Sequence, residues 1–168
     1  KALRAVEDPK QRHSFERNPG TGLELDWVRD VRVNRSAVER RAATLPGRRS
    51  VKKEWQAAWL VRAIQCMDLT TLSGDDTPGR VQRLCAKARQ PLSPKMVTAL
   101  GLDHVGLTTG AVCVYHEMVP VAVRALEGSG IPVAAVSTGF PHGLSPLAQR
   151  IEEIEASVEA GAEEIDIV

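Results

Sequence analysis

The chain has 168 residues, of which 43% are hydrophobic, so it is long enough for one domain with a core and too apolar for general disorder. A formal net charge of +1 argues against a nucleic-acid-binding protein, and no apolar run is long enough to span a bilayer. The three cysteines, Cys66, Cys85 and Cys113, contain no C-x-x-C pair. They suit a reducing compartment, and we therefore expect a cytoplasmic protein that binds neither nucleic acid nor membranes.

The N-terminal part of the chain is basic. Residues 1–50 contain 12 Lys and Arg against 7 Asp and Glu, whereas residues 51–168 contain 10 against 14. Residues 1–22 are polar and broken by proline and glycine, so we expect a flexible tail followed by an ordered domain from residue 23 to 168. Scattered arginines without interleaved aromatic residues favour a solvated leader over a nucleic-acid contact.

Two helices are predicted next. Residues 36–39, Ser-Ala-Val-Glu, match a capping box and predict a helix that stops before Pro46. A second helix is expected over residues 52–63. Its Trp55 and Trp59 lie one turn apart on the same face, and core packing is the favoured interpretation of this pair.

From residue 65 onwards, strands alternate with helices. Apolar runs predict strands at residues 65–70, 111–115, 133–137 and 163–168. Ser or Thr followed by Pro marks three helix starts, and Gly161 ends the last helix. The starts are Thr77-Pro78, Ser93-Pro94 and Ser145-Pro146. This alternation predicts an α/β fold with a parallel sheet built from βαβ units.

Two architectures fit such a sheet, a doubly wound fold and a (β/α)8 barrel. The first strand–helix turn of a dinucleotide fold should read G-x-G-x-x-G, but residues 71–76 read Thr-Leu-Ser-Gly-Asp-Asp. No G-x-x-x-x-G-K-[ST] loop occurs either. These absences argue against a dinucleotide-binding fold.

Each predicted strand is apolar in the middle and polar near its C-terminal end. Strand periodicity places one polar set on the face opposite the apolar set, where it would point inward at the top of a barrel. The polar residues near the strand ends are Asp68, Thr70, Cys113, Tyr115, Ser137, Thr138 and Asp166. Barrel enzymes carry their catalytic groups at this end. The alternative is that Asp68 and Asp166 only cap backbone amides or pair with lysines elsewhere.

Metal-binding patterns are weak in this sequence. His116-Glu117 resembles the start of H-E-x-x-H, but Pro120 stands where the second histidine belongs. Asp75-Asp76 could bind a cation, although acidic residues before a helix N-terminus are explained by the helix dipole. We expect neither a metal nor another cofactor.

Five segments in this order and spacing resemble the animal form of the deoxyribose-phosphate aldolase family. They are VKKEWQAAWL at 51–60, DLTTLSGDDT at 68–77, AVCVY at 111–115, STGFP at 137–141 and EIDIV at 164–168. One departure is His116, where the family usually has proline.

The resemblance implies a class I aldolase with the α/β fold of a TIM (β/α)8 barrel, of which this chain holds about the first four strands with N-terminal helices. Such an enzyme cleaves 2-deoxy-D-ribose 5-phosphate, a small phosphosugar, to glyceraldehyde 3-phosphate and acetaldehyde through a lysine Schiff base, without cofactors, in cytoplasmic deoxyribonucleotide catabolism. Asp166 matches the family's proton donor and acceptor, and Asp68, Thr70 and Cys113 match supporting residues of the pocket. The family's lysine motif, Ile-Lys-Thr-Ser-Thr-Gly, does not occur here.

Residues 23–168 are accordingly expected to be the N-terminal half of one barrel domain, inactive by itself, and the resemblance allows a homo-oligomer. Two other interpretations remain open. One is a truncated, non-catalytic product or interaction module that lacks the lysine. The other, which the motifs disfavour, is a different Schiff-base aldolase barrel.

Overall fold

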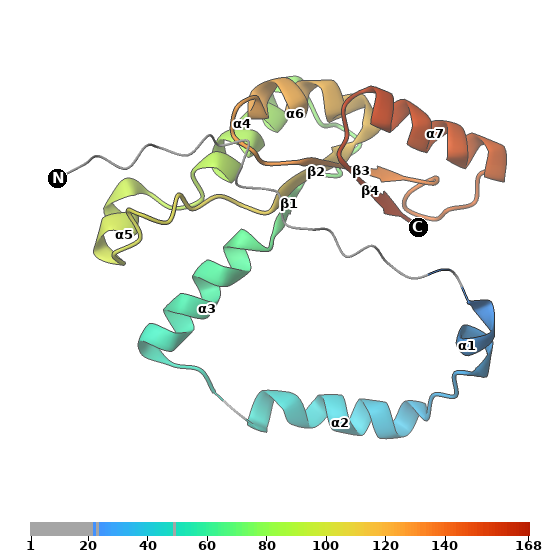
Figure 1. Cartoon of the computed structure of the whole chain (residues 1–168), viewed down its shortest axis with the longest axis horizontal. Helices are drawn as coiled ribbons and strands as arrows, with labels where there is room; N and C mark the ends of the chain where they lie inside the picture. Colours follow the sequence, from blue (N-terminus) through green and yellow to red (C-terminus); the bar gives the residue numbers. More distant parts are fainter. Residues whose placement is uncertain (1–21, 23, 49) are drawn as a thin grey trace.

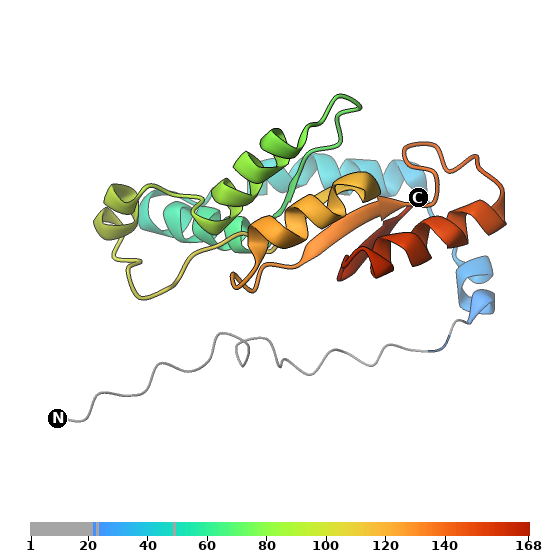
Figure 2. The ribbon, with the colours of Figure 1, turned by 90° about the horizontal axis from the view of Figure 1, so that it is seen from above.

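A computed structural model describes residues 22, 24–48 and 50–168 of the chain (Figure 1, Figure 2). The expectation of a flexible tail at residues 1–22 lies, apart from Gly22, outside the described residues. The elements are α1 (Leu25–Asp30), α2 (Arg35–Arg48), α3 (Lys53–Gln65), β1 (Asp68–Thr70), α4 (Pro78–Arg89), α5 (Pro94–Ala99), β2 (Ala111–Tyr115), η2 (His116–Met118), α6 (Val119–Leu126), β3 (Val133–Ser137), α7 (Leu147–Glu159) and β4 (Glu164–Ile167).

The four strands form one parallel sheet in the order β1-β2-β3-β4. The predicted bounds of β2 and β3 are confirmed, and β4 is one residue shorter at each end. The prediction for the first strand was wrong at its start, because α3 continues to Gln65 and Cys66 closes that helix with backbone bonds. The parallel α/β sheet predicted from the sequence is therefore present.

Local capping explains where α4 and α5 begin. Thr77 accepts a hydrogen bond from the amide of Arg80, and Ser93 accepts one from the amide of Met96, as the two Ser/Thr-Pro signals predict. The third signal was wrong, since Ser145 does not cap α7 and Pro146 occupies the N-cap position without a side-chain bond. Gly161 follows α7 with φ +101°, a conformation that favours glycine.

The apolar core lies between the sheet and its helices. Figure 1 shows α4, α6 and α7 on one side of the sheet, and α4 packs against both α6 and β2. Fully buried valines fill this layer, and each contributes about 1.5–3 kcal/mol by leaving water. They are Val81, Val112, Val114 and Val119. The core thus fixes which face of each strand points away from the helices.

A smaller cluster lies on the opposite face of the sheet. It contains Cys113, Ala134 and Val136, with Tyr115 and Phe140 packed beside them. The two aromatic rings meet edge to face with their centroids 5.9 Å apart. This is the face that the sequence assigned to polar strand ends.

The N-terminal helices extend away from the sheet on the side opposite α4, α6 and α7 (Figure 1). None of the residues in α1, α2 or α3 is buried. The expected core packing of Trp55 and Trp59 was therefore wrong, because these side chains are 70% and 64% exposed. Helical spacing reveals an apolar face but not what covers it.

The predicted bounds of α2 also need correction. Asn34, not Ser36, caps the helix, since its side-chain oxygen accepts from the amide of Ala37 at 3.1 Å. The helix runs past Pro46 to Arg48. Pro46 lies in the last turn, where its missing N–H removes only one of the final helical bonds. Within the described residues, no helix is long and apolar enough to cross a membrane.

Candidate functional site

The site residues predicted from the sequence meet on the face of the sheet that points away from α4, α6 and α7. The Cys113 Sγ donates to Asp166 Oδ2 at 3.4 Å, although β2 and β4 are separated by β3. Neighbouring strands lie about 4.8 Å apart, so a contact over two strand spacings requires a small intervening side chain. Ala134, fully buried and paired in register with Cys113, supplies it.

Asp68 and Thr70 complete this group from β1. Thr70 is the register partner of Cys113, and its hydroxyl donates to the main-chain oxygen of Asp68 at 2.8 Å. The Thr70 side chain lowers the pKa of the Cys113 thiol, whereas the negative charge of Asp68 raises it. The structure therefore brings together Asp68, Thr70, Cys113 and Asp166, which are spread over nearly 100 positions of sequence.

Electrostatics keep the Cys113 thiol protonated. Burial raises its pKa, and the hydrogen bond to Asp166 and the charge of Asp166 raise it further, to about 12. Only the thiolate is a strong nucleophile, so this cysteine is a poor one at neutral pH. Its chemical role in this arrangement is to donate a hydrogen bond to Asp166.

A tight turn follows β3 and contacts the end of β4. Thr138 and Gly139 have φ +64° and +77°, and a Cβ on Gly139 would lie 2.6 Å from the hydroxyl of Ser145. The Thr138 hydroxyl accepts from the amide of Val168 at 2.7 Å. The Gly139 amide donates to the Glu153 carboxylate at 2.9 Å. Sequence reasoning missed Glu153, because nothing local distinguishes it from the other acidic residues of α7.

The position of Ser137 contradicts one prediction, which placed this residue among the polar side chains that point inward. Alternation along β3 places it with Val133 and Ala135, which belong to the helix-facing core, rather than with Ala134 and Val136. It is fully buried, and its hydroxyl is one of the buried polar atoms without a hydrogen-bond partner among the described residues.

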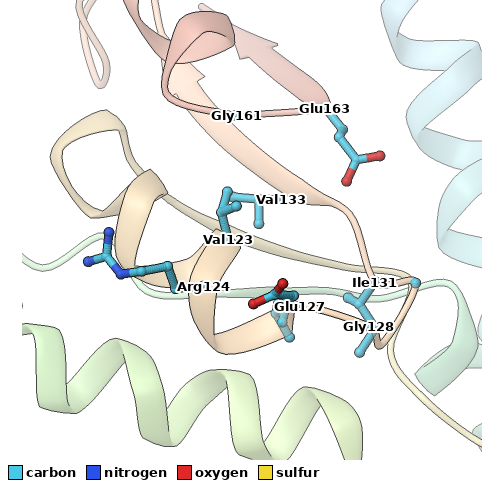
Figure 3. A pocket seen from close by; sticks show the side chains of 10 residues that line it. Val123, Arg124, Glu127, Gly128, Ile131, Val133, Gly161 and Glu163 are labelled. Atoms are coloured by element: carbon cyan, nitrogen blue, oxygen red, sulfur yellow. The ribbon is translucent and has the colours of Figure 1, made fainter.

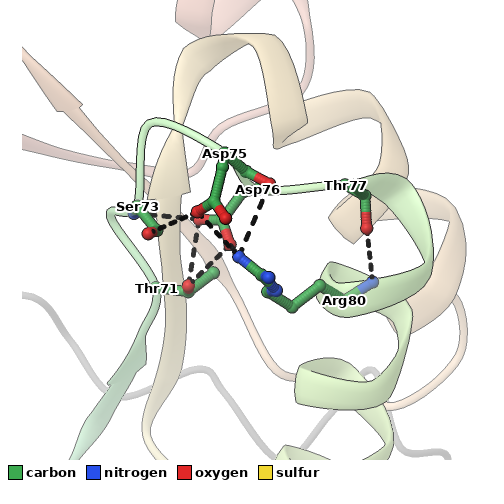
Figure 4. A network of polar contacts seen from close by, with 6 residues as sticks. All are labelled: Thr71, Ser73, Asp75, Asp76, Thr77 and Arg80. Carbon is green, nitrogen blue, oxygen red and sulfur yellow. Dashed lines mark hydrogen bonds and ion pairs between the residues drawn. The ribbon is translucent and has the colours of Figure 1, made fainter.

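The acidic loop before α4 is internally satisfied (Figure 4). Asp76 accepts from the Thr71 hydroxyl at 2.9 Å and from the Ser73 amide at 3.1 Å. The Arg80 guanidinium bonds Asp75 at 2.9 Å and reaches Asp76 at 3.5 Å. The hydrogen bonds from Ser73 and Arg80 and the charge of Arg80 lower the pKa of Asp75. These contacts give the two carboxylates a structural role in shaping the loop.

The described part of the chain has its lysines outside the strands and contains no cluster of metal-binding side chains. The described lysines, Lys52, Lys53, Lys87 and Lys95, lie in or next to helices and are exposed. Among the described residues, no group of three His, Cys, Asp or Glu side chains could hold a metal ion. His116 Nε2 lies 3.2 Å from the Glu117 carboxylate, and its Nδ1 lies 4.0 Å from that of Glu153.

A pocket of about 460 Å³ lies at the other end of the strands (Figure 3). It is lined by the end of α6, the start of β3 and the turn before β4, and includes Arg124, Glu127, Gly161 and Glu163. None of the four grouped site residues lines it. The pocket is thus separate from the group around Asp166.

Comparison with known proteins gives close sequence relatives. No protein-family model matches the chain. It is 56% identical over 151 residues to the deoxyribose-phosphate aldolase of Mus musculus and 54% identical over 151 residues to that of Bos taurus. It is also 53% identical over 153 residues to that of Homo sapiens. These alignments cover 89–90% of this chain but 48% of each relative, so the chain spans about half their length.

Solved structures give the same picture for the fold. A protein from Coccidioides immitis assigned as a deoxyribose-phosphate aldolase matches with a TM-score of 0.51 and 29% identity, over 64% of this chain and 36% of that one. A protein from Toxoplasma gondii with the same assignment matches with a TM-score of 0.52 over 68% of this chain and 38% of its own; at 19% identity it bears on fold alone. The parallel sheet is accordingly the first part of a (β/α)8 barrel.

Proposed function

Because the chain belongs to the deoxyribose-phosphate aldolase family, we propose that its full-length gene product reversibly cleaves 2-deoxy-D-ribose 5-phosphate to glyceraldehyde 3-phosphate and acetaldehyde. The observation that carries this proposal is the 53–56% identity over 151–153 residues to relatives of that name. The grouping of Asp68, Thr70, Cys113 and Asp166 at one place on the sheet is consistent with it.

In this proposal, Asp166 moves the proton. A lysine amine outside the described residues forms a Schiff base with the aldehyde carbon, and the protonated imine accepts the electron pair as the carbon–carbon bond breaks. Asp166, directly or through water, takes the proton of the substrate hydroxyl, so that this carbon leaves as an aldehyde. The same proton then returns to the enamine carbon, and hydrolysis releases acetaldehyde and the amine.

The neighbours of Asp166 prepare it for this role. The Cys113 thiol, kept neutral by burial and by Asp166 itself, donates to one carboxylate oxygen at 3.4 Å and leaves the other available. Thr70 pairs in register with Cys113, and its hydroxyl donates to the main-chain oxygen of Asp68. We assign Asp68, Thr70 and Cys113 supporting roles in lining the pocket and orienting Asp166.

The setting of the reaction follows from its chemistry. The substrate is a small phosphosugar, and Schiff-base catalysis needs neither a metal nor an organic cofactor. Three thiols without a disulfide fit a reducing compartment, and we propose the cytoplasm, with a role in deoxyribonucleotide catabolism. A homo-oligomer is compatible with this proposal.

Trapping the Schiff base tests the proposed function. The full-length gene product and the 168-residue chain are each incubated with deoxyribose 5-phosphate, reduced with borohydride and digested for mass spectrometry. We expect one lysine adduct in the full-length protein, outside residues 1–168, and none on the 168-residue chain. A folded full-length protein without adduct or turnover would instead support a non-catalytic interaction module.

A substitution at Asp166 tests the assignment of its role. Asp166→Asn keeps the shape of the side chain but removes the base, so turnover in the full-length protein should fall about 100-fold or more. Glu155→Gln, a charge change at an exposed position of α7, is the matched control and should leave turnover unchanged. Near-normal turnover in Asp166→Asn would remove Asp166 from the mechanism.

A further inference from the structure

Glu153 reaches from α7 to the turn that follows β3. Its Oε2 accepts from the Gly139 amide at 2.9 Å, a bond between residues 14 positions apart. Its side chain is 24% exposed, so much of the carboxylate is withdrawn from water. The other oxygen, Oε1, lies 4.0 Å from Nδ1 of His116, at the end of β2. One carboxylate therefore joins α7 to the ends of two strands.

The turn that Glu153 contacts, at Thr138 and Gly139, also contacts the end of β4. Next to Gly139, Thr138 has a positive φ, which is uncommon for a non-glycine residue and is kept only where surrounding contacts maintain it. Its hydroxyl donates to the main-chain oxygen of Ser137 at 2.6 Å and accepts from the Val168 amide at 2.7 Å. Val168 is two residues beyond Asp166, so the turn sets the path of the strand that carries this carboxylate.

We propose that Glu153 is a positioning residue for Asp166, acting through the Gly139 amide and the Thr138–Val168 hydrogen bond. It touches neither substrate nor reacting atoms, and its effect is to keep the end of β4 at the distance from β2 at which Cys113 and Asp166 meet. This inference rests on the proposed function, because it assigns Glu153 a part in placing the carboxylate that moves the proton.

Hydrogen exchange tests the linkage without any assay of activity. In the full-length gene product, single-amide exchange is followed at Gly139 and Val168 for the wild type, Glu153→Ala, Glu153→Gln and the exposed control Glu155→Ala. We expect exchange at both amides to become about tenfold faster in Glu153→Ala, because one anchoring hydrogen bond is lost. Glu153→Gln, whose side-chain oxygen still accepts, and Glu155→Ala should remain close to wild type. Unchanged exchange at either amide in Glu153→Ala overturns the proposal.

Kinetics test whether the linkage serves the reaction. In the same protein, Glu153→Ala should lower kcat about ten- to a hundredfold with KM nearly unchanged, the effect of a displaced catalytic group. Glu153→Gln should recover most of kcat, a rescue that a general loss of stability would not produce. A Glu153→Gln variant as slow as Glu153→Ala overturns the proposal. A wild type without turnover refutes the proposed function instead, and the exchange measurement still decides whether Glu153 holds β4.

Discussion

Asp166→Asn should make the Cys113 thiol more reactive. In the wild type the pKa of this thiol is about 12, so at pH 9 about one molecule in a thousand carries the thiolate. The substitution removes the negative charge 3.4 Å from the sulfur and leaves the burial of Cys113 unchanged. The pKa should therefore fall but stay above its usual value of 9.0, because burial is its largest cause.

The expected size of the effect follows from one charge-assisted hydrogen bond. Such a bond contributes about 1.5 kcal/mol or more, which corresponds to about a tenfold increase in thiolate. A less basic thiolate is also intrinsically less nucleophilic. This lowers the alkylation rate of each thiolate about threefold and cancels part of the gain. We expect Cys113 in Asp166→Asn to be alkylated about three- to fivefold faster than in the wild type.

Alkylation with iodoacetamide at pH 9, quenched at intervals and quantified by peptide mass spectrometry, measures this rate. Cys85 provides an internal control, since it is fully buried in the helix-facing core and its pKa is raised by burial. An equal increase at Cys85 would indicate general loosening of the fold. Asp68→Asn should have a smaller effect, because Asp68 is the weakest of the influences on Cys113. An unchanged Cys113 rate in Asp166→Asn would refute the contact between these side chains.

Three further predictions concern stability, each measured by urea unfolding of the full-length protein. Thr77→Ala removes the N-cap of α4 and should lower the free energy of unfolding by about 1 kcal/mol; no change would mean that the cap is replaced by water. Gly161→Ala should cost about 1 kcal/mol or more, because φ is +101° there, and a stabilising effect would contradict that conformation. Val112→Ala should cost about 2 kcal/mol, because Val112 is fully buried between the sheet and its helices, and an unchanged free energy of unfolding would contradict the described core.

Features that depend on neighbours in the chain were predictable from the sequence. The bounds of β2 and β3 follow from short apolar runs ended by polar or turn-forming residues. The caps at Thr77 and Ser93 follow from a hydroxyl placed before proline, since the donor and acceptor are only three residues apart. Strand periodicity also placed Cys113 and Asp166 on the same face. Each of these depends on interactions that the order of residues determines within one turn or one strand.

Tertiary structure decided the features that depend on distance across the fold. The contact between Cys113 and Asp166 exists because Ala134, on the strand between them, is small enough to let the two side chains meet. The exposure of Trp55 and the role of Glu153 were also unpredictable, because helical spacing shows that a face is apolar or charged but not what lies against it. Residue order determines local backbone geometry, whereas packing between distant segments determines which side chains meet, and in this protein the group around Asp166 is assembled by that packing.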